Sequence, residues 1–352
     1  MEVPMAKSTL EKKSKTARYA GIDFHKTFSL VTLGDKHGEE ILQEKLWHSD
    51  VSSIKKFFKT HDKVVCAIES CRGYEWFLDL LRDLGLEVHV CNPVKMKVIC
   101  QTAFKNDKID SRKIMDLLAR NYLPTSYQAT PEERHLRERV RWRANLVRKG
   151  TSIKNAIKAV LAKENISIKD ACSRTGRLKL VEAKISKAHR AILDDMFESL
   201  DANDTAVAIQ TKWLEQCAKK DKRVALLKTI PGFGSISAIA FIAEVGEVSR
   251  FKRPSQVASY FGLVPRLSES ADKRRQGGIT KTGSTELRWL LVQDAWTAVR
   301  NSPELRRRYL NICRRRGKQI AVVSIARKLA EIAFCVLRDR KPFNESNLRK
   351  RD

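Results

Sequence analysis

Four acidic residues, Asp23, Glu69, Asp107 and Asp110, are the side chains of this sequence whose types and spacing are best suited to chemistry. They occur in a chain with 69 Lys and Arg residues against 41 Asp and Glu, a formal net charge of +28 at pH 7. A polypeptide this basic attracts polyanions, so carboxylates at apolar strand ends and on one helix face need a specific role. Carboxylate oxygens suit Mg²⁺ or Mn²⁺, and two such ions about 3.5 to 4 Å apart can activate an attacking oxygen and stabilise a leaving one. The four acids therefore predict a divalent-metal site that acts on a phosphodiester.

Two of the acids belong to predicted strands. Side chains alternate along a strand, so Asp23 points away from its apolar neighbours Ile22 and Phe24. On its own, Asp23 also fits an ordinary solvent-facing strand position. Glu69 directly follows the apolar run VVCAI, residues 64–68, which is typical of a strand buried on both faces. Open α/β sheets bind ligands at the carboxyl ends of such strands, so Glu69 is the stronger candidate of the two.

The other two acids are three residues apart in the helical stretch KNDKIDSRKIMDLLAR, so they point the same way. The row continues to Ile114 and Leu117, which predicts that Asp107 and Asp110 face the sheet. Burying two carboxylates side by side is costly unless a cation or hydrogen bonds compensate. Metal binding removes this cost. The alternative for Asp107 is a favourable interaction with the amino-terminal end of the helix.

The elements that must position these acids form a β-β-α-β-α-β pattern followed by a helix. This order predicts an α/β domain with a mixed sheet over residues 18–125. The predicted strands lie in residues 18–33, 40–47, 64–68 and 87–91, and the predicted helices cover residues 51–59 and 74–84.

The remainder of the chain is predicted to be mostly helical. Residues 131–222 read as a long helical linker or coiled arm suited to dimerisation, and residues 223–345 as a separate C-terminal domain. The turn IPGFG, residues 230–234, lies between two apolar helices, as in a helix-hairpin-helix motif. There Gly232 and Gly234 would let backbone amides approach a phosphate. The alternative is an ordinary helical hairpin with a glycine-rich turn.

Composition narrows the class of protein. The sequence pI is near 9.9, which favours a nucleic acid as partner, with an anionic membrane surface as the competing explanation. No apolar run is long enough to span a bilayer, and residues 1–17 form a polar basic tail without a hydrophobic signal core. None of the eight cysteines forms a C-x-x-C pair, which argues against a zinc site. We expect a cytoplasmic protein associated with the bacterial nucleoid.

Two sets of motifs resemble one family. AGIDFHK, AIES with CRGYEW, and VKMKVICQTAFKNDKIDSRKIMDLLAR resemble the N-terminal domain of the DEDD insertion-sequence transposases of the IS-one-ten family. LKTIPGFGSISAIAFIAEVGEVSRF, ASYFGLVPR and RRQGGITKTGSTELRWLLVQDAW resemble the C-terminal transposase domain of the same family, in the same order. The resemblance covers about residues 18–340.

The resemblance implies roles for specific residues. Asp23, Glu69, Asp107 and Asp110 would be the metal-binding acids of an RNase H-like or RuvC-like domain. A serine after GLVPR would attack DNA and form a covalent phosphoserine link, and by register that residue is Ser270, with Ser268 as the alternative. The family usually has Ser-Ser-Gly where this chain has Glu-Ser-Ala. Family members are also thought to act as dimers or tetramers, in which one subunit's acids complete another's serine site, and to be guided by a structured RNA encoded by the element.

The predicted loop over residues 265–283 surrounds Ser270 with cations and glycines, which suit a phosphate. Its candidate nucleic-acid-binding residues are Arg266, Lys273, Arg274, Arg275 and Lys281. The basic helical stretches 131–163 and 305–328 are expected to contact phosphate backbones without reading sequence.

Three functions follow from these features. The first is a metal-dependent DNA recombinase that cuts and rejoins strands to move an insertion sequence. The second is a RuvC-like endonuclease specific for Holliday junctions, which would share the acids but would not need Ser270. The third is a non-catalytic nucleic-acid-binding protein in which the acids are structural.

Overall fold

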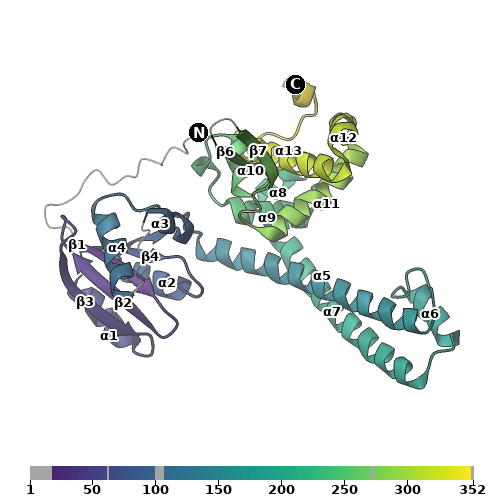
Figure 1. Ribbon diagram of the computed structural model, residues 1–352, viewed down its shortest axis with the longest axis horizontal. Coiled ribbons are helices and arrows are strands. Elements are labelled where there is room, and N and C mark those ends of the chain that lie inside the picture. The colour runs from purple at the N-terminus through teal and green to yellow at the C-terminus, as the bar shows by residue number, and fades with distance from the viewer. Residues whose placement is uncertain (1–17, 62, 100–106, 271–272, 350–352) are drawn as a thin grey trace. The chain divides into compact units, whose positions relative to one another are not determined.

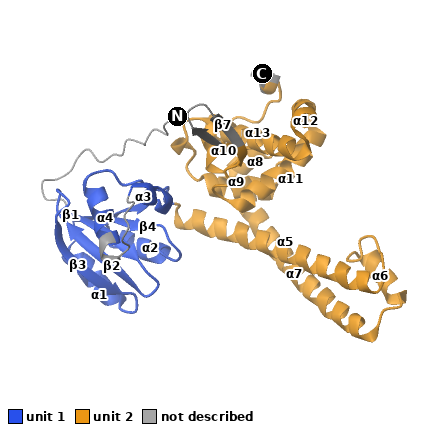
Figure 2. Cartoon of the chain, in the orientation of Figure 1, with its two compact units in different colours: residues 1–128 blue, residues 129–352 orange. Residues whose placement is uncertain are grey.

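The structure, a computed structural model, describes residues 18–61, 63–99, 107–270 and 273–349. The predicted basic tail, residues 1–17, lies outside these ranges. The chain divides into two compact units, residues 1–128 and 129–352 (Figure 2). Within the described ranges, no helix combines the length and the apolar character needed to cross a bilayer.

The first unit is built on a five-stranded mixed sheet (Figure 1), which confirms the predicted α/β fold. The strand order is β3-β2-β1-β4-β5; β2 is antiparallel to β1 and β3, and β4 is parallel to β1 and β5. The strands are β1 (Arg18–Phe24), β2 (Phe28–Gly34), β3 (Glu40–Trp47), β4 (Val64–Glu69) and β5 (Glu87–Cys91).

One boundary differs from the prediction. Residues 18–33 were expected to form a single strand, but they form β1 and most of β2, joined by the turn at residues 25–27. The amide of His25 donates to the carbonyl of Phe28 at 2.9 Å and closes this turn. The apolar residues on both sides of the turn continue the alternation of a single strand, so the hydrophobic pattern does not reveal the break.

Both faces of the sheet are covered. The apolar run of β4 is almost fully buried, as expected for a central strand: Cys66, Ala67 and Ile68 have no exposed surface. On one face, Ile22 and Ile68 pack with α1 (Val51–Thr60) and α2 (Glu75–Asp83). On the other face, Tyr19 and Ala67 pack with α4 (Asp107–Ala119), and α3 (Pro93–Ile99) contributes Met96.

Gly21 sets how closely α4 approaches the sheet. A Cβ atom built at Gly21 would lie 2.0 Å from the carbonyl oxygen of Ser111 and 2.4 Å from the amide nitrogen of Met115. Any larger residue would therefore push α4 away from β1. The buried hydroxyl of Ser111 also hydrogen-bonds that of Thr32 on β2 at 2.8 Å, which fixes the helix on this face.

The second unit begins with two long helices, α5 (Pro131–Lys163) and α7 (Lys187–Lys220), which pack as an antiparallel hairpin with α6 (Arg174–Glu182) at its far end (Figure 1). A capping box between Thr130 and Glu133 starts α5. At the other end of the hairpin, Arg137 donates to the carbonyl of Ala243 at 2.6 Å, and Arg141 pairs with the buried carboxylate of Glu244 at 3.2 Å. These contacts join the hairpin to the C-terminal core, so both belong to one compact unit.

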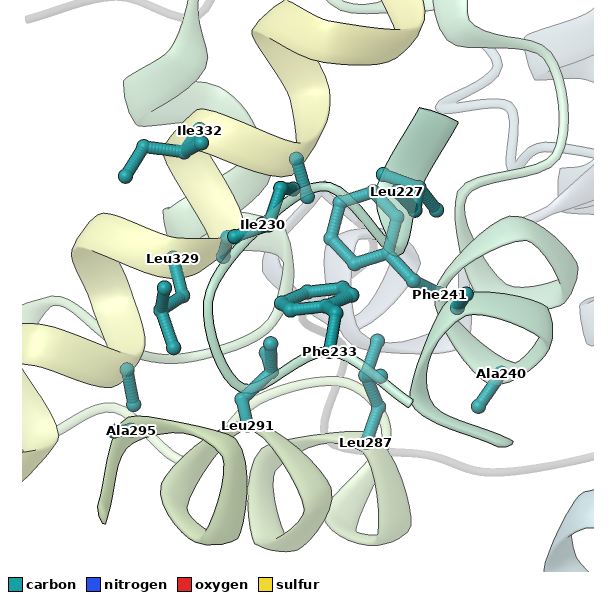
Figure 3. Close-up of a cluster of buried hydrophobic side chains, with 14 of the residues drawn as sticks. Leu227, Ile230, Phe233, Ala240, Phe241, Leu287, Leu291, Ala295, Leu329 and Ile332 are labelled. Carbon is teal, nitrogen blue, oxygen red and sulfur yellow. The ribbon is translucent and has the colours of Figure 1, made fainter. Parts of the chain in front are cut away.

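The C-terminal part of this unit is a helical core. Phe233 lies at its centre, between Leu287 and Leu291 on one side and Ile230 and Phe241 on the other (Figure 3). Its helices are α8 (Lys222–Leu227), α9 (Ser235–Val245), the short 3₁₀ helix η1 (Val248–Arg250), α10 (Pro254–Tyr260), α11 (Thr285–Asn301), α12 (Pro303–Arg316), α13 (Lys318–Asp339) and α14 (Ser346–Arg349). The predicted mostly helical C-terminal region is confirmed.

The predicted loop over residues 265–283 contains a β-hairpin instead, formed by β6 (Pro265–Ser270) and β7 (Lys273–Ile279). The two strands are antiparallel, with Ser268 opposite Arg275 and Ser270 opposite Lys273. Backbone pairing between the strands supplies the hydrogen bonds that hold this polar segment.

Candidate active site

Asp23 and Glu69 are neighbours on adjacent strands. β1 and β4 run parallel with Ile22 opposite Ile68, so the next residue on each strand lies at the same level. Because Ile22 and Ile68 are buried against α1 and α2, alternation directs Asp23 and Glu69 to the face that carries α4. The two acids therefore meet at the carboxyl ends of two parallel strands, as the sequence predicts for a ligand site.

The direction of α4 places its first turn at the same end of the sheet. Ser111 lies against Gly21, and the side chain of Met115 lies against Gly34, which pairs with Tyr19. Moving along α4 therefore means moving back along β1, so α4 starts near the end of β1 that carries Asp23. Asp107 opens this helix.

The buried row of α4 is shifted by one residue from the prediction. It consists of Ser111, Ile114, Met115, Leu118 and Ala119. The side chain of Asp110, at the edge of this row, is 42% exposed and lies 3.8 Å from the ammonium group of Lys113. Asp107 is four residues before Ser111 on the same helix, and its side chain is outside the part of the structure that is described.

The pKa of the Cys71 thiol depends on the negative charge of the first two acids, Asp23 and Glu69. Its thiol donates to the carbonyl of Phe24 at 3.6 Å. Partial burial, together with the negative charges of Glu69 and Asp23, raises the pKa of this thiol to about 11. Both carboxylates thus act on one group just beyond the end of β4.

The donor set at this end of the sheet fits a hard divalent cation. Asp23 and Glu69 offer carboxylate oxygens from adjacent strands, the ligand type that Mg²⁺ and Mn²⁺ prefer. Among the described residues, no group of three or more His, Cys, Asp and Glu side chains is placed to hold a metal. The two other predicted acids, Asp107 and Asp110, belong to the first turn of α4.

The predicted serine lies in the second unit. Ser270 is the last residue of β6, and Ser268 is two positions earlier in the same strand. Their side chains, and those of Lys273, Arg274 and Arg275, are outside the described part of the structure. Arg266 and Lys281 are exposed, at the base of the same hairpin.

The two glycines predicted to approach a phosphate have different surroundings. Gly232 has φ +91°, and a Cβ atom there would lie 2.3 Å from the carbonyl oxygen of Asp294 on α11. Its conformation and this contact explain the glycine by folding alone. Gly234 is the N-cap of α9, and a Cβ atom there would meet no other atom within 4 Å. Of the two, only Gly234 leaves room for a ligand.

Two family models match the chain. Residues 20–166 match one described as "Transposase", of the DEDD type of IS110, and residues 224–310 match one described as "Transposase IS116/IS110/IS902 family". The chain belongs to this family of transposases. The first match contains all four acids, and the second contains Gly232, Gly234 and Ser270.

Relatives of known name support the same assignment. A "Probable family 20 transposase" of Pseudomonas aeruginosa is 27% identical over 90% of this chain and 96% of its own length. The transposase for insertion sequence element IS1111A of Coxiella burnetii is 25% identical over 92% of this chain and 90% of its own. A pilin gene-inverting protein of Moraxella bovis is 28% identical over 44% of this chain and 50% of its own. The protein is thus an insertion-sequence transposase, a recombinase that cleaves DNA.

Sequence reasoning missed two residues of this transposase. His25 is not among the site residues predicted from the sequence, but its Nε2 lies 3.1 Å from Oδ2 of Asp23. Its position two residues after Asp23 was the available signal. Arg288 on α11 donates to the carbonyls of Phe261 at 3.2 Å and Gly283 at 3.1 Å, at the base of the β6–β7 hairpin. No local pattern distinguishes Arg288 from the other arginines of the C-terminal region.

The basic helices expose many of their charges. On α12, five arginines are exposed to solvent: Arg306, Arg307, Arg314, Arg315 and Arg316. On α5, Arg141 is exposed, while Arg148 pairs with Glu286 at 3.1 Å. An exposed row of arginines on α12 suits contact with a phosphate backbone.

Proposed function

We propose that this transposase cuts and rejoins DNA by a divalent-metal-dependent mechanism in which Asp23, Glu69, Asp107 and Asp110 hold Mg²⁺ or Mn²⁺. The supporting observation is the register that sets Asp23 beside Glu69, with the first turn of α4 at the same end of the sheet. When bound, the cation supplies Lewis-acid activation of the phosphodiester. His25, 3.1 Å from Asp23, orients that carboxylate.

We further propose that Ser270 is the nucleophile, with Ser268 as the alternative. The hydroxyl oxygen of the serine forms a bond to phosphorus as the bond to the leaving sugar oxygen breaks. The serine proton leaves with the departing sugar hydroxyl, and the number of phosphate ester bonds is unchanged. Rejoining by the reverse exchange then needs no external energy source. The basic residues of the hairpin, including Arg266 and Lys281, would hold the DNA phosphates near this serine.

The wider proposal concerns partners. The family resemblance supports a homo-oligomer, dimer or tetramer, and a structured RNA encoded by the element as guide for target choice. The long α5–α7 hairpin offers an extended helical surface for association between subunits. The turn that contains Gly234 would contact a DNA phosphate in the manner of a helix-hairpin-helix.

One observation favours a second function, site-specific DNA inversion. A partial relative is named a pilin gene-inverting protein. Inversion uses the same strand cleavage and rejoining but keeps the segment in the same molecule. A reporter that scores excised circles and inverted segments from one donor plasmid separates the two activities.

Excision from a donor plasmid in cells tests the proposal. We expect Asp107→Ala and Ser270→Ala each to abolish circle formation, a fall of more than about 10³-fold because each removes a group that acts on the reacting phosphate. Asp116→Asn is the matched control, since Asp116 lies on the same helix but pairs with Arg120 at 2.6 Å. Circles at the normal level from Asp107→Ala, or from the variant with both Ser268 and Ser270 replaced by alanine, would exclude the mechanism. If Asp107→Ala loses activity and the serine variants do not, the result would favour a junction endonuclease that forms no serine intermediate.

A further inference from the structure

An aromatic and cationic cluster lies beside the candidate acids, and none of the proposed roles uses it. The ring of His25 is 4.6 Å from that of Phe28, and the ring of Phe28 is 5.7 Å from that of Trp47. The ammonium group of Lys45 lies 3.9 Å from the centre of the Phe28 ring and 4.1 Å from that of Trp47. We call Phe28, Lys45 and Trp47 the aromatic platform.

The platform shares a face and an end of the sheet with Asp23. Phe28 pairs with Trp47, and Leu30 pairs with both Lys45 and Asp23, so these side chains point to the same side of the sheet. β2 starts and β3 ends where β1 ends. His25 bridges the gap, because its imidazole contacts Asp23 on one side and Phe28 on the other.

The distance between Asp23 and Trp47 can be spanned by a few nucleotides of one nucleic-acid strand. Trp47 lies two strands from Asp23 across the sheet and two residues further along it, so at a strand spacing of about 4.8 Å and a rise of about 3.3 Å per residue the two positions are about 12 Å apart. Stacked nucleotides rise by about 3.4 Å each along a strand. A base two to four nucleotides from the phosphate at Asp23 would therefore reach Trp47.

The platform is held in place yet open to solvent. Trp47 is 52% exposed on the edge strand, although burial of its indole would be favourable. The next residue, His48, hydrogen-bonds Ser29 at 2.8 Å and stacks on Phe24 at 4.7 Å, which fixes the end of β3. A rigid, exposed aromatic ring with a lysine over it is the arrangement that binds unpaired bases with adjacent phosphates.

We propose that the aromatic platform stacks an unpaired base of the DNA strand whose phosphodiester lies at Asp23 and Glu69. This inference rests on the proposed DNA cleavage at those acids and names a further contact of the same site. Lys45, and the exposed Lys26 in the adjoining turn, complement the phosphates on both sides of the stacked base. Stacking fixes the position of the strand, so Trp47 is a positioning residue and takes no part in bond breaking.

Photo-crosslinking tests the contact without reference to activity. The full-length protein is mixed with a single-stranded 5-iodouracil DNA oligonucleotide in Ca²⁺, irradiated, digested and mapped by mass spectrometry. We expect adducts on Trp47 or Phe28. The same sequence made as 5-iodouridine RNA is the second arm. Adducts with the RNA alone, or with neither probe, would overturn the proposal.

Variants give the energetic test. Trp47→Ala should weaken binding of a fluorescein-labelled single-stranded DNA by about 5- to 150-fold, the range measured for loss of one stacked base. Trp47→Phe should recover most of it, because the ring is kept. Trp142→Ala is the matched control: Trp142 on α5 is 45% exposed and also has a lysine, Lys149, 5.2 Å from its ring centre. Equal losses from Trp47→Ala and Trp142→Ala, or an unchanged affinity accompanied by altered self-association for Trp47→Ala, would contradict the platform.

The outcome is separable from that of the proposed function. A crosslink at Trp47 in a protein that never cleaves DNA would retain the platform and exclude the mechanism. The opposite outcome is cleavage that requires Asp107 and is unchanged in Trp47→Ala, with no adduct at Phe28 or Trp47. It would support the metal-dependent cleavage and exclude the aromatic platform.

Discussion

At the scale of single residues, the site depends on charges held where water is scarce. Asp23 is 17% exposed and lies against His25, while Glu69 ends the most apolar strand of the sheet. A carboxylate in such a position is stabilised by a nearby cation. Two carboxylates with one histidine remain negative overall, which favours a divalent ion over a structural ion pair.

Cys71 provides a readout of metal binding that does not require activity. The charges of Glu69 and Asp23 help to raise its pKa to about 11. A divalent cation held by these carboxylates would cancel their charge and lower the thiol pKa. We expect the pH midpoint of Cys71 alkylation by iodoacetamide to fall when Mg²⁺ is added, and each unit would give about tenfold more thiolate at fixed pH.

Two variants control this measurement. Cys71→Ser identifies the thiol, and in a protein with both Asp23→Asn and Glu69→Gln the midpoint should not respond to Mg²⁺. A wild-type midpoint that is the same with and without Mg²⁺ and Mn²⁺ would argue against metal binding at these acids.

Asp294 makes the stability of the second unit depend on pH. Its Oδ1 accepts a hydrogen bond from Ser237 at 2.8 Å, but its buried Oδ2 has no hydrogen-bond partner among the described residues. Burial raises the pKa of this carboxyl to about 7. Because the pKa is higher in the folded state, the protonated carboxyl of Asp294 contributes fully to the free energy of unfolding below about pH 4. This contribution is lost as the pH rises through 7.

Asp294→Asn should therefore increase the free energy of unfolding of the second unit at pH 8 by up to about 4 kcal/mol, measured by urea unfolding. This increase in stability should become smaller toward pH 4. The exposed Asp195 on α7 offers the control, since Asp195→Asn should leave the pH profile unchanged. A constant gain for Asp294→Asn across this range would show that Asp294 does not titrate as described.

At the scale of elements, single backbone contacts determine how closely neighbouring segments pack. The turn between α8 and α9 illustrates this: Gly232 is required for folding, whereas Gly234 can be changed to test DNA binding. Gly232→Ala would force a Cβ atom to within 2.3 Å of the Asp294 carbonyl at a positive φ, so we expect a loss of about 2 to 4 kcal/mol in the free energy of unfolding.

Gly234→Ala should fold normally, since its Cβ atom meets nothing within 4 Å. If the amino-terminal end of α9 contacts a phosphate, this variant should bind duplex DNA about two- to fivefold more weakly. Urea unfolding and fluorescence anisotropy measure the two quantities. Unchanged DNA affinity for Gly234→Ala would remove this turn from the nucleic-acid interface.

The elements also show what the sequence could predict. The run VVCAI identified β4 and the position of Glu69 because a doubly buried strand has few alternatives. The buried row of α4 was misplaced by one residue because Ser111 is polar, yet its hydroxyl is satisfied by Thr32 and so can be buried. The β6–β7 hairpin was read as a loop because KRRQGGI has no apolar alternation; pairing with β6 supplies its order.

At the scale of the whole molecule, the acids and the serine belong to different compact units. The motif order predicts this separation, but no local pattern could reveal the aromatic platform, whose members come from β2 and β3 and meet only through strand pairing. The charge of +28 makes DNA affinity strongly dependent on salt, so all variants must be compared at one ionic strength.

The central claim is that carboxylates of the first unit and a serine of the second act in one reaction. The most direct test is a covalent-adduct assay with end-labelled donor DNA and Mg²⁺, analysed on a denaturing gel with and without protease. Wild-type protein and Ser268→Ala should yield a protease-sensitive protein–DNA adduct, and Asp107→Ala and Ser270→Ala should yield none. An adduct of normal yield from Asp107→Ala, or from the variant with both serines replaced, would contradict the account.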